Sequence, residues 1–190
     1  MRIGVYGGSF DPPHAGHIIL AADALKHLEL DVVLFVPASV QPFKADRSGG
    51  ATAEQRAAMV ALSIGSEDAF KSDTVELDRG GLSYTVDTLE ELSRRYAGAE
   101  LFLIVGEDAL DDFAKWKSPN RIKELATIAI LRRHVGASER PLPPGVVEAS
   151  SRLVEISSTE IRERVKKGNS IRGFVTEAVE NYIEANALYT

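Results

Sequence analysis

Two histidines stand three residues apart, directly after a glycine-rich turn. His14 and His17 follow the apolar run 3–6 and the segment 7–13, whose sequence is GGSFDPP. This order predicts a strand, a tight turn and the start of a helix. The spacing places both imidazoles on one face of the first helical turn, beside backbone N–H groups that carry partial positive charge. We therefore expect a phosphate-bearing ligand here.

The alternative for a pair of histidines is structural, with one capping or packing and the other exposed. Their position at a strand-to-helix turn favours the binding role. Gly16 between them costs about 1 kcal/mol relative to Ala inside a helix, which predicts that something large approaches the helix start. A zinc-protease site is excluded because Ala15 replaces the required Glu and because that site needs a four-residue spacing.

Composition restricts the remaining possibilities. The chain has 190 residues, of which 44% are hydrophobic and 26% charged, and this suits one folded domain over residues 1–190. The absence of cysteine excludes disulfides, thiol catalysis and thiolate metal sites. A net charge of −6 argues against general nucleic-acid binding. No apolar stretch is long enough to cross a bilayer and no secretory leader precedes the first strand, so we expect a cytoplasmic protein without a membrane partner.

Helical and apolar segments alternate along the chain. Strands are predicted near 3–6, 31–36, 73–77, 100–105, 127–131 and 152–156, and helices near 14–29, 52–64 and 83–96. A short helix is predicted after the cap Ser118-Pro119, and two more after Ser157 and Thr176. Residues 134–150 read as a surface loop. The predicted fold class is α/β, a Rossmann-like doubly wound parallel sheet with helices on both faces. A small C-terminal part, about 150–190, adds a strand and helices.

The segment GGSFDPPHAGH resembles the G-[TS]-F-D-P-x-H-x-G-H signature of the nucleotidylyltransferase superfamily. Further matches run in order from residue 4 to the end of the chain. The resemblance implies that Gly8, Ser9 and Phe10 bind ATP together with His14 and His17. The two histidines are the candidate catalytic residues. A dehydrogenase is disfavoured because the dinucleotide fingerprint G-x-G-x-x-G is absent.

A second pattern, SYTVDTL at 83–89, resembles the branch that adenylylates nicotinate or nicotinamide mononucleotide. Read alone, it is a hydroxyl-rich helix cap. The resemblance implies that Tyr84 and Thr85 face the substituent of the pyridine ring. It also implies that Trp116 stacks on that ring, whereas a single Trp is otherwise most often a core residue.

Two further segments resemble nucleotide-binding motifs. Gly106 and Asp108 fit the family's G-x-D, in which the Asp lies near the nucleotide sugar or adenine; a helix N-cap is the structural alternative. The segment 156–162 matches I-S-S-T-x-I-R and has the spacing of a capping box. We expect Ser157, Ser158 and Arg162 to hold the triphosphate at this second helix start.

Several residues near the expected site are ambiguous. Lys44 ends the segment 41–44, which resembles P-P-H-K with Phe43 in place of the His. It is a candidate for the mononucleotide phosphate, although loop lysines are usually solvated. Of Arg132 and Arg133, we favour Arg133 as the contact to the mononucleotide. Arg56 and Met59 match family positions but are assigned no chemistry, and Asp11 is expected to tie down the turn rather than bind metal.

The prediction is a nicotinate-nucleotide adenylyltransferase that joins ATP and nicotinate mononucleotide. The attacking phosphate is already anionic, so no general base is needed, and Mg²⁺ is expected to bind through the ATP phosphates without its own protein site. A phosphopantetheine or other small-molecule adenylyltransferase of the superfamily is the first alternative, and a non-catalytic nucleotide-binding module the second. Sequence leaves open the choice between nicotinate and nicotinamide, and whether the chain forms a homo-oligomer.

Overall fold

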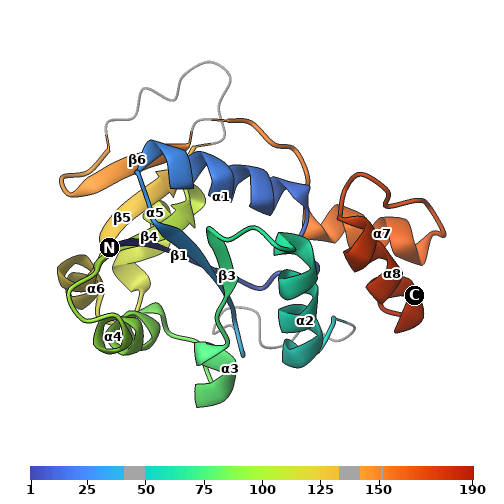
Figure 1. The fold of residues 1–190 in the computed structure, drawn as a ribbon, viewed down its shortest axis with the longest axis horizontal. Coiled ribbons are helices and arrows are strands. Elements are labelled where there is room, and N and C mark those ends of the chain that lie inside the picture. Colours follow the sequence, from blue (N-terminus) through green and yellow to red (C-terminus); the bar gives the residue numbers. More distant parts are fainter. Residues whose placement is uncertain (41–49, 133–141, 151) are drawn as a thin grey trace.

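A parallel sheet forms the centre of the computed structural model, which describes residues 1–40, 50–132, 142–150 and 152–190 (Figure 1). Among the described residues the sheet has six strands in the order β3-β2-β1-β4-β5-β6, and every neighbouring pair is parallel. The strands are β1 (Arg2–Gly8), β2 (Val32–Pro37), β3 (Phe70–Ser72), β4 (Glu100–Gly106), β5 (Thr127–Leu131) and β6 (Val146–Ser150).

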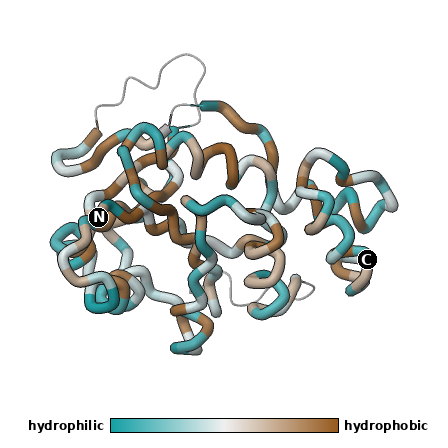
Figure 2. Tube along the Cα trace, in the orientation of Figure 1, coloured by the Kyte–Doolittle hydropathy of each residue, from teal (hydrophilic) through white to brown (hydrophobic). Residues whose placement is uncertain are grey.

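The central strands are apolar because both of their faces are covered. In β2, Val33 and Phe35 pack on one side of the sheet, whereas Val32 and Leu34 pack on the other. All residues of β2 are buried. Figure 2 shows these strands as the hydrophobic middle of the molecule. A continuous apolar run is the pattern typical of such strands.

Helices cover both faces, as the predicted doubly wound fold requires. One face carries α1 (Ala15–His27) and α2 (Ala53–Ile64), and the other carries α3 (Val75–Arg79), α4 (Thr85–Arg95) and α6 (Pro119–Leu125). Between β4 and α6 the chain forms the short α5 (Asp108–Asp112) and a 3-10 turn, η1 (Phe113–Lys115). The predicted fold class is confirmed.

The last two helices pack on the outer side of α2 rather than on the sheet (Figure 1). They are α7 (Ser158–Lys166) and α8 (Glu177–Ala185). Met59 of α2 is fully buried among Ile161, Val179 and Ile183. The match of Met59 to a family position therefore reflects packing.

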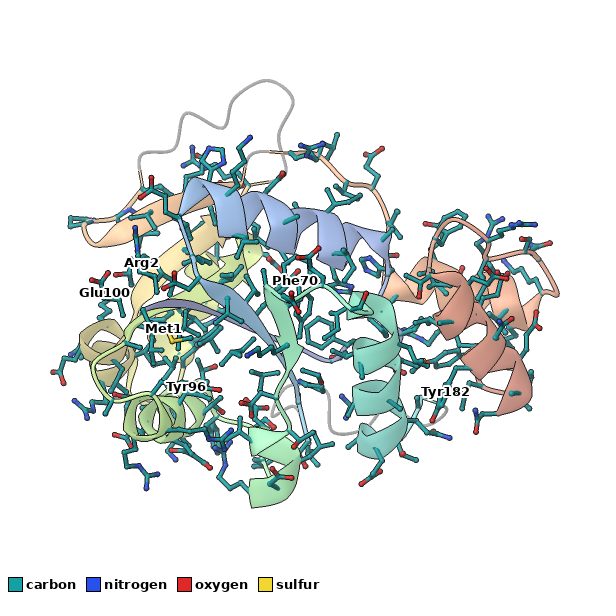
Figure 3. All side chains as sticks on the ribbon, viewed as in Figure 1. Met1, Arg2, Phe70, Tyr96, Glu100 and Tyr182 are labelled. Carbon is teal, nitrogen blue, oxygen red and sulfur yellow. The ribbon has the colours of Figure 1, made fainter. Side chains whose placement is uncertain are left out.

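The two ends of the sheet differ in structure. At the amino-terminal ends of β1 and β4, Arg2 and Glu100 lie opposite each other, with Nε and Oε2 3.7 Å apart (Figure 3). At the carboxyl end, β1 lies between β2 and β4, and the helices that follow these strands cover opposite faces of the sheet. Such a switch point at the carboxyl edge is where open α/β sheets bind ligands.

The predicted strand 73–77 is wrong. The strand is the preceding segment, β3, and residues 75–79 form α3. Asp73 ends the strand because its Oδ1 accepts a 3.0 Å hydrogen bond from the backbone N–H of Val75. Its carboxylate is also held by Arg95, 2.8 Å away. A local side-chain bond of this kind stabilises a turn in competition with the sheet.

The predicted position of the last strand, 152–156, is also wrong, because the strand lies at the end of the segment 134–150 that was predicted to be a loop. The last strand is β6, whose Val146 and Val147 pair with Ile128 and Ala129 of β5. Gly145 has φ 80°, which lets the chain turn into the strand. Residues 152–156 have no regular structure. Pairing with β5 and the burial of Ala149 thus determine where the last strand lies in the chain. The alternation of polar and apolar residues in the sequence did not indicate this position.

Candidate active site

The two predicted histidines stack at the start of α1. Their ring centroids lie 3.7 Å apart with 32° between the planes, as the three-residue spacing predicts. The backbone N–H of His14 donates a 3.1 Å hydrogen bond to Nδ1 of His17. A neutral imidazole that accepts at Nδ1 carries its proton on Nε2. His17 therefore presents an N–H donor on its other edge.

Gly16 is needed for the packing of this pair. A Cβ at this position would lie 3.0 Å from Nδ1 of His14 and 3.1 Å from Cγ1 of Val154. The sequence predicted that something large approaches the helix start at Gly16. In the structure the approaching groups are the His14 ring and the side chain of Val154.

A first cleft of about 500 Å³ opens in front of the histidines. Of the residues predicted to bind ATP, it brings together Ser9, Phe10, His14, His17, Ser157, Ser158 and Arg162. Phe10 is only 2% exposed and supports His17 with its ring, whose centroid lies 5.0 Å from that of the imidazole. Phe10 has φ 49°, an unfavourable backbone state for a bulky residue that is retained where packing enforces it.

The start of α7 is bonded directly to the turn before α1. Ser158 Oγ donates a 2.8 Å hydrogen bond to the carbonyl of Pro12, and Arg162 Nη1 donates one of 2.7 Å to the carbonyl of Asp11. Ser157 Oγ accepts from the N–H of Glu160 at 3.1 Å, so it is the N-cap of α7. The starts of α1 and α7, the Arg162 guanidinium and two histidines thus line one cleft, which suits a polyphosphate.

Asp11 is the structural tie that the sequence predicted. Its Oδ1 accepts hydrogen bonds from the backbone N–H of Ala51 at 3.0 Å and from the hydroxyl of Tyr189 at 2.7 Å. Its Oδ2 lies 4.0 Å from Arg162 Nη1. Burial, followed by the charge of Asp11, raises the pKa of Tyr189, so the phenol remains a donor. Sequence reasoning missed Tyr189, since no pattern links it to a residue at the other end of the chain.

Arg56 is a second residue that sequence reasoning left without a role. It is 8% exposed, and it donates to the carbonyls of Ser9 at 2.7 Å, Ala38 at 2.6 Å and Ser39 at 3.0 Å. Burial lowers its pKa. Arg56 thereby fixes the chain after β1 to the chain after β2. The match to a family position was the only signal, and it did not indicate carbonyl partners.

A second cleft, of about 630 Å³, lies beside the first at the carboxyl edge of the sheet. It brings together the predicted mononucleotide residues Tyr84, Thr85 and Trp116. The Trp116 ring is partly buried against Phe113, with centroids 5.4 Å apart. Trp116 is therefore both a packing residue and a wall of the cleft.

The second cleft also contains Gly8, Gly106 and Asp108, which the sequence grouped with ATP. A Cβ at Gly106 would collide with Oδ1 of Asp108. Asp108 is the first residue of α5 and not its N-cap, which is Glu107. Tyr6 lines both clefts, so they meet at the end of β1.

Glu76 is a buried carboxylate in the second cleft that sequence reasoning missed. It is 7% exposed, and its Oε1 accepts a 2.6 Å hydrogen bond from Thr88, which also accepts one of 3.1 Å from Arg79. Lys117 lies above the Tyr84 ring, 4.7 Å from its centroid, and pairs with Asp87 at 2.8 Å. These contacts hold α3 and the start of α4 around the cleft.

Two predicted site residues, Lys44 and Arg133, lie outside the described residues. Arg132 faces Glu148 and Glu107, at 3.5 and 3.8 Å. In the part of the chain that the structure describes, no three His, Asp or Glu side chains gather as a metal site. Across the same residues, none of the helices has the length and apolar character needed to span a membrane.

Comparisons with known proteins agree with this geometry. A family model described as cytidylyltransferase-like matches residues 5–164. A Gemmatimonas aurantiaca protein named "Probable nicotinate-nucleotide adenylyltransferase" is 43% identical over 197 residues, covering 100% of this chain and 92% of the relative. A Thermus thermophilus protein of the same name is 47% identical over 190 residues, covering all of both chains.

Solved structures share the fold. The Plasmodium falciparum nicotinic acid mononucleotide adenylyltransferase complexed with NaAD has a TM-score of 0.79 at 21% identity, covering 99% of this chain and 97% of that one. The same enzyme complexed with APC gives a TM-score of 0.76, covering 99% and 96%. The family match, the two full-length relatives and the fold agree, and the chain belongs to the nicotinate-nucleotide adenylyltransferase family of cytidylyltransferase-like proteins.

Proposed function

We propose that this chain transfers the adenylyl group of ATP to nicotinate mononucleotide, forming nicotinate adenine dinucleotide and pyrophosphate in NAD biosynthesis. The observation that carries the proposal is the meeting of two clefts at the carboxyl end of β1, one suited to a polyphosphate and one walled by an aromatic ring. The names of the full-length relatives support the choice of substrates.

The first cleft is the proposed site of the triphosphate. The N–H groups at the starts of α1 and α7 supply partial positive charge, and Arg162 supplies a full one. His14 and His17 lie beside these groups and donate to the phosphates. Gly8, Gly106 and Asp108 border the second cleft, where a ribose attached to the α-phosphate would reach them, and Asp108 would accept hydrogen bonds from its hydroxyls.

The second cleft is the proposed site of the mononucleotide. Trp116 would stack on the pyridine ring, and the groups of Tyr84 and Thr85 would face its carboxylate. Lys44 and Arg133 remain proposed partners of the mononucleotide phosphate. The same cleft also contains the buried carboxylate of Glu76, which is held by Thr88, and the ion pair of Asp112 with Lys115.

The reaction needs little beyond positioning. An oxygen of the mononucleotide phosphate attacks the α-phosphorus of ATP, and the bond from that phosphorus to the bridging oxygen of the β-phosphate breaks. Pyrophosphate leaves with the bonding electrons, and His14, His17 and Arg162 stabilise its charge. Because the attacking oxygen is already anionic, no proton has to be removed. Mg²⁺ bound through phosphate oxygens would neutralise further charge.

A pyrophosphate-release assay tests the proposal. With ATP and Mg²⁺, we expect release to require an acceptor and to be faster with nicotinate mononucleotide than with nicotinamide mononucleotide or phosphopantetheine. His17→Ala is expected to lower turnover by about 100-fold or more. No release with any acceptor would overturn the enzyme in favour of a non-catalytic module. Release with phosphopantetheine alone would overturn the choice of substrate.

A further inference from the structure

Tyr189, which follows α8, reaches the turn that holds the catalytic histidines. Its hydroxyl donates a 2.7 Å hydrogen bond to Oδ1 of Asp11, across 178 positions of sequence. Its backbone has φ 63°, a state that costs a non-glycine residue about 1–2 kcal/mol. Its ring packs against the apolar cluster formed by α2, α7 and α8. The surroundings thus hold Tyr189 in an unfavourable conformation that brings its hydroxyl to Asp11.

The carboxylate of Asp11 lies between this hydroxyl and a cation of the first cleft. Oδ1 has two donors, Tyr189 and the backbone N–H of Ala51. Oδ2 lies 4.0 Å from Arg162 Nη1, which is too far for a hydrogen bond. Arg162 instead donates to the Asp11 carbonyl at 2.7 Å and to Thr159 Oγ1 at 3.1 Å, which leaves its guanidinium lining the cleft.

We propose that Tyr189 is a positioning residue for ATP, because its hydroxyl anchors the Asp11 carboxylate and so prevents a close ion pair between Asp11 and Arg162. Without the hydroxyl, Asp11 has one donor fewer on Oδ1, and the Arg162 guanidinium already lies 4.0 Å from its Oδ2. Arg56 is committed to three backbone carbonyls. The side chains of Asp11 and Arg162 would then close on each other, which would draw the arginine away from the phosphates.

Tyr189→Phe tests this role, with Tyr182→Phe as a matched control. Both rings pack against the same apolar cluster, and Tyr182 lies on α8 (Figure 3). We expect Tyr189→Phe to raise the KM for ATP, and the Kd of a non-hydrolysable ATP analogue, by about three- to tenfold. The KM for nicotinate mononucleotide and the Tm should stay near the wild-type values, and Tyr182→Phe should leave all four quantities unchanged.

A double-mutant cycle shows whether Tyr189 acts through Arg162. In an Arg162→Ala background, Tyr189→Phe should weaken binding of the ATP analogue no further. Additive losses would overturn the proposal, as would an unchanged KM for ATP or equal rises in both KM values.

The inference rests on the proposed function, and the Arg162→Ala variant shows whether a negative result contradicts the placement of ATP or only the role of Tyr189. If Arg162→Ala does not weaken binding of the ATP analogue, the placement of ATP fails and the role of Tyr189 fails with it. If Arg162→Ala weakens binding and Tyr189→Phe does not, only the role of Tyr189 is overturned.

Discussion

Ser158 Oγ donates a 2.8 Å hydrogen bond to the carbonyl of Pro12, although 146 positions separate the two residues. This bond joins the start of α7 to the turn that precedes α1. Residues from both helix starts line the same cleft, His14 and His17 from one and Arg162 from the other. We propose that this arrangement holds one ATP polyphosphate.

Gly16→Ala should impair catalysis more than folding. The added Cβ would lie 3.0 Å from Nδ1 of His14, closer than almost all real Cβ contacts. Alanine gains helix propensity, which offsets part of the clash in the unfolding free energy. Displacement of His14 should lower turnover by about tenfold or more. Steady-state kinetics and thermal unfolding measure the two effects. A variant with normal turnover would show that the position of the His14 ring is unimportant.

Trp116→Ala should weaken binding of the mononucleotide selectively. Loss of a stacking surface is worth about 1–3 kcal/mol per ring, so the KM for nicotinate mononucleotide should rise by roughly five- to 150-fold. The KM for ATP should remain unchanged, and Trp116→Phe should restore much of the loss. The two KM values measure this selectivity. Equal effects on both substrates, together with a lower Tm, would mean that Trp116 acts only through its packing on Phe113.

Arg56→Lys should destabilise the fold. A lysine cannot reproduce the planar fork that serves Ser9, Ala38 and Ser39, and buried carbonyls would lose their donors. We expect the free energy of unfolding in urea to fall by about 2–4 kcal/mol. Arg94→Lys, on the exposed face of α4, is the control and should change it by less than about 0.5 kcal/mol. Similar values for both variants would contradict a structural role for Arg56.

Tyr189 should make stability fall at alkaline pH. A tyrosine in the unfolded chain ionises near pH 10, whereas burial and Asp11 raise the pKa of Tyr189 in the folded protein. Above about pH 10 the folded state therefore binds more protons than the unfolded state, and stability falls as pH rises. Below pH 10 the tyrosine is protonated in both states, so its contribution to the free energy of unfolding is fully present. Urea unfolding from pH 8 to 11 should show a steeper loss for the wild type than for Tyr189→Phe. Parallel curves would contradict the raised pKa.

Sequence was sufficient where local chemistry decides the structure. The turn and the helix start around His14 and His17 follow from glycines, prolines and spacing, although His14 is the extended N-cap of α1 and not a helical residue. The strand near 100–105 is a short continuous apolar run, a pattern typical of a strand buried in a parallel sheet. The capping residue Ser157 was recognisable because its bond to Glu160 spans one helical turn.

Sequence was insufficient where distant contacts decide. Residues 73–77 alternate in polarity, but the turn at Asp73 and its ion pair with Arg95 start a helix. The last strand was misplaced because its pairing with β5 is not visible in its own composition. The roles of Arg56 and Tyr189 depend on partners at least 17 positions away, and no local pattern records them.

The most direct test is a crystal structure of the protein with a non-hydrolysable ATP analogue and Mg²⁺. We expect the β- and γ-phosphates to lie in the first cleft, within hydrogen-bonding distance of both His17 and Arg162. A triphosphate bound in the second cleft beside Trp116, or one that contacts only one of the two helix starts, would contradict it.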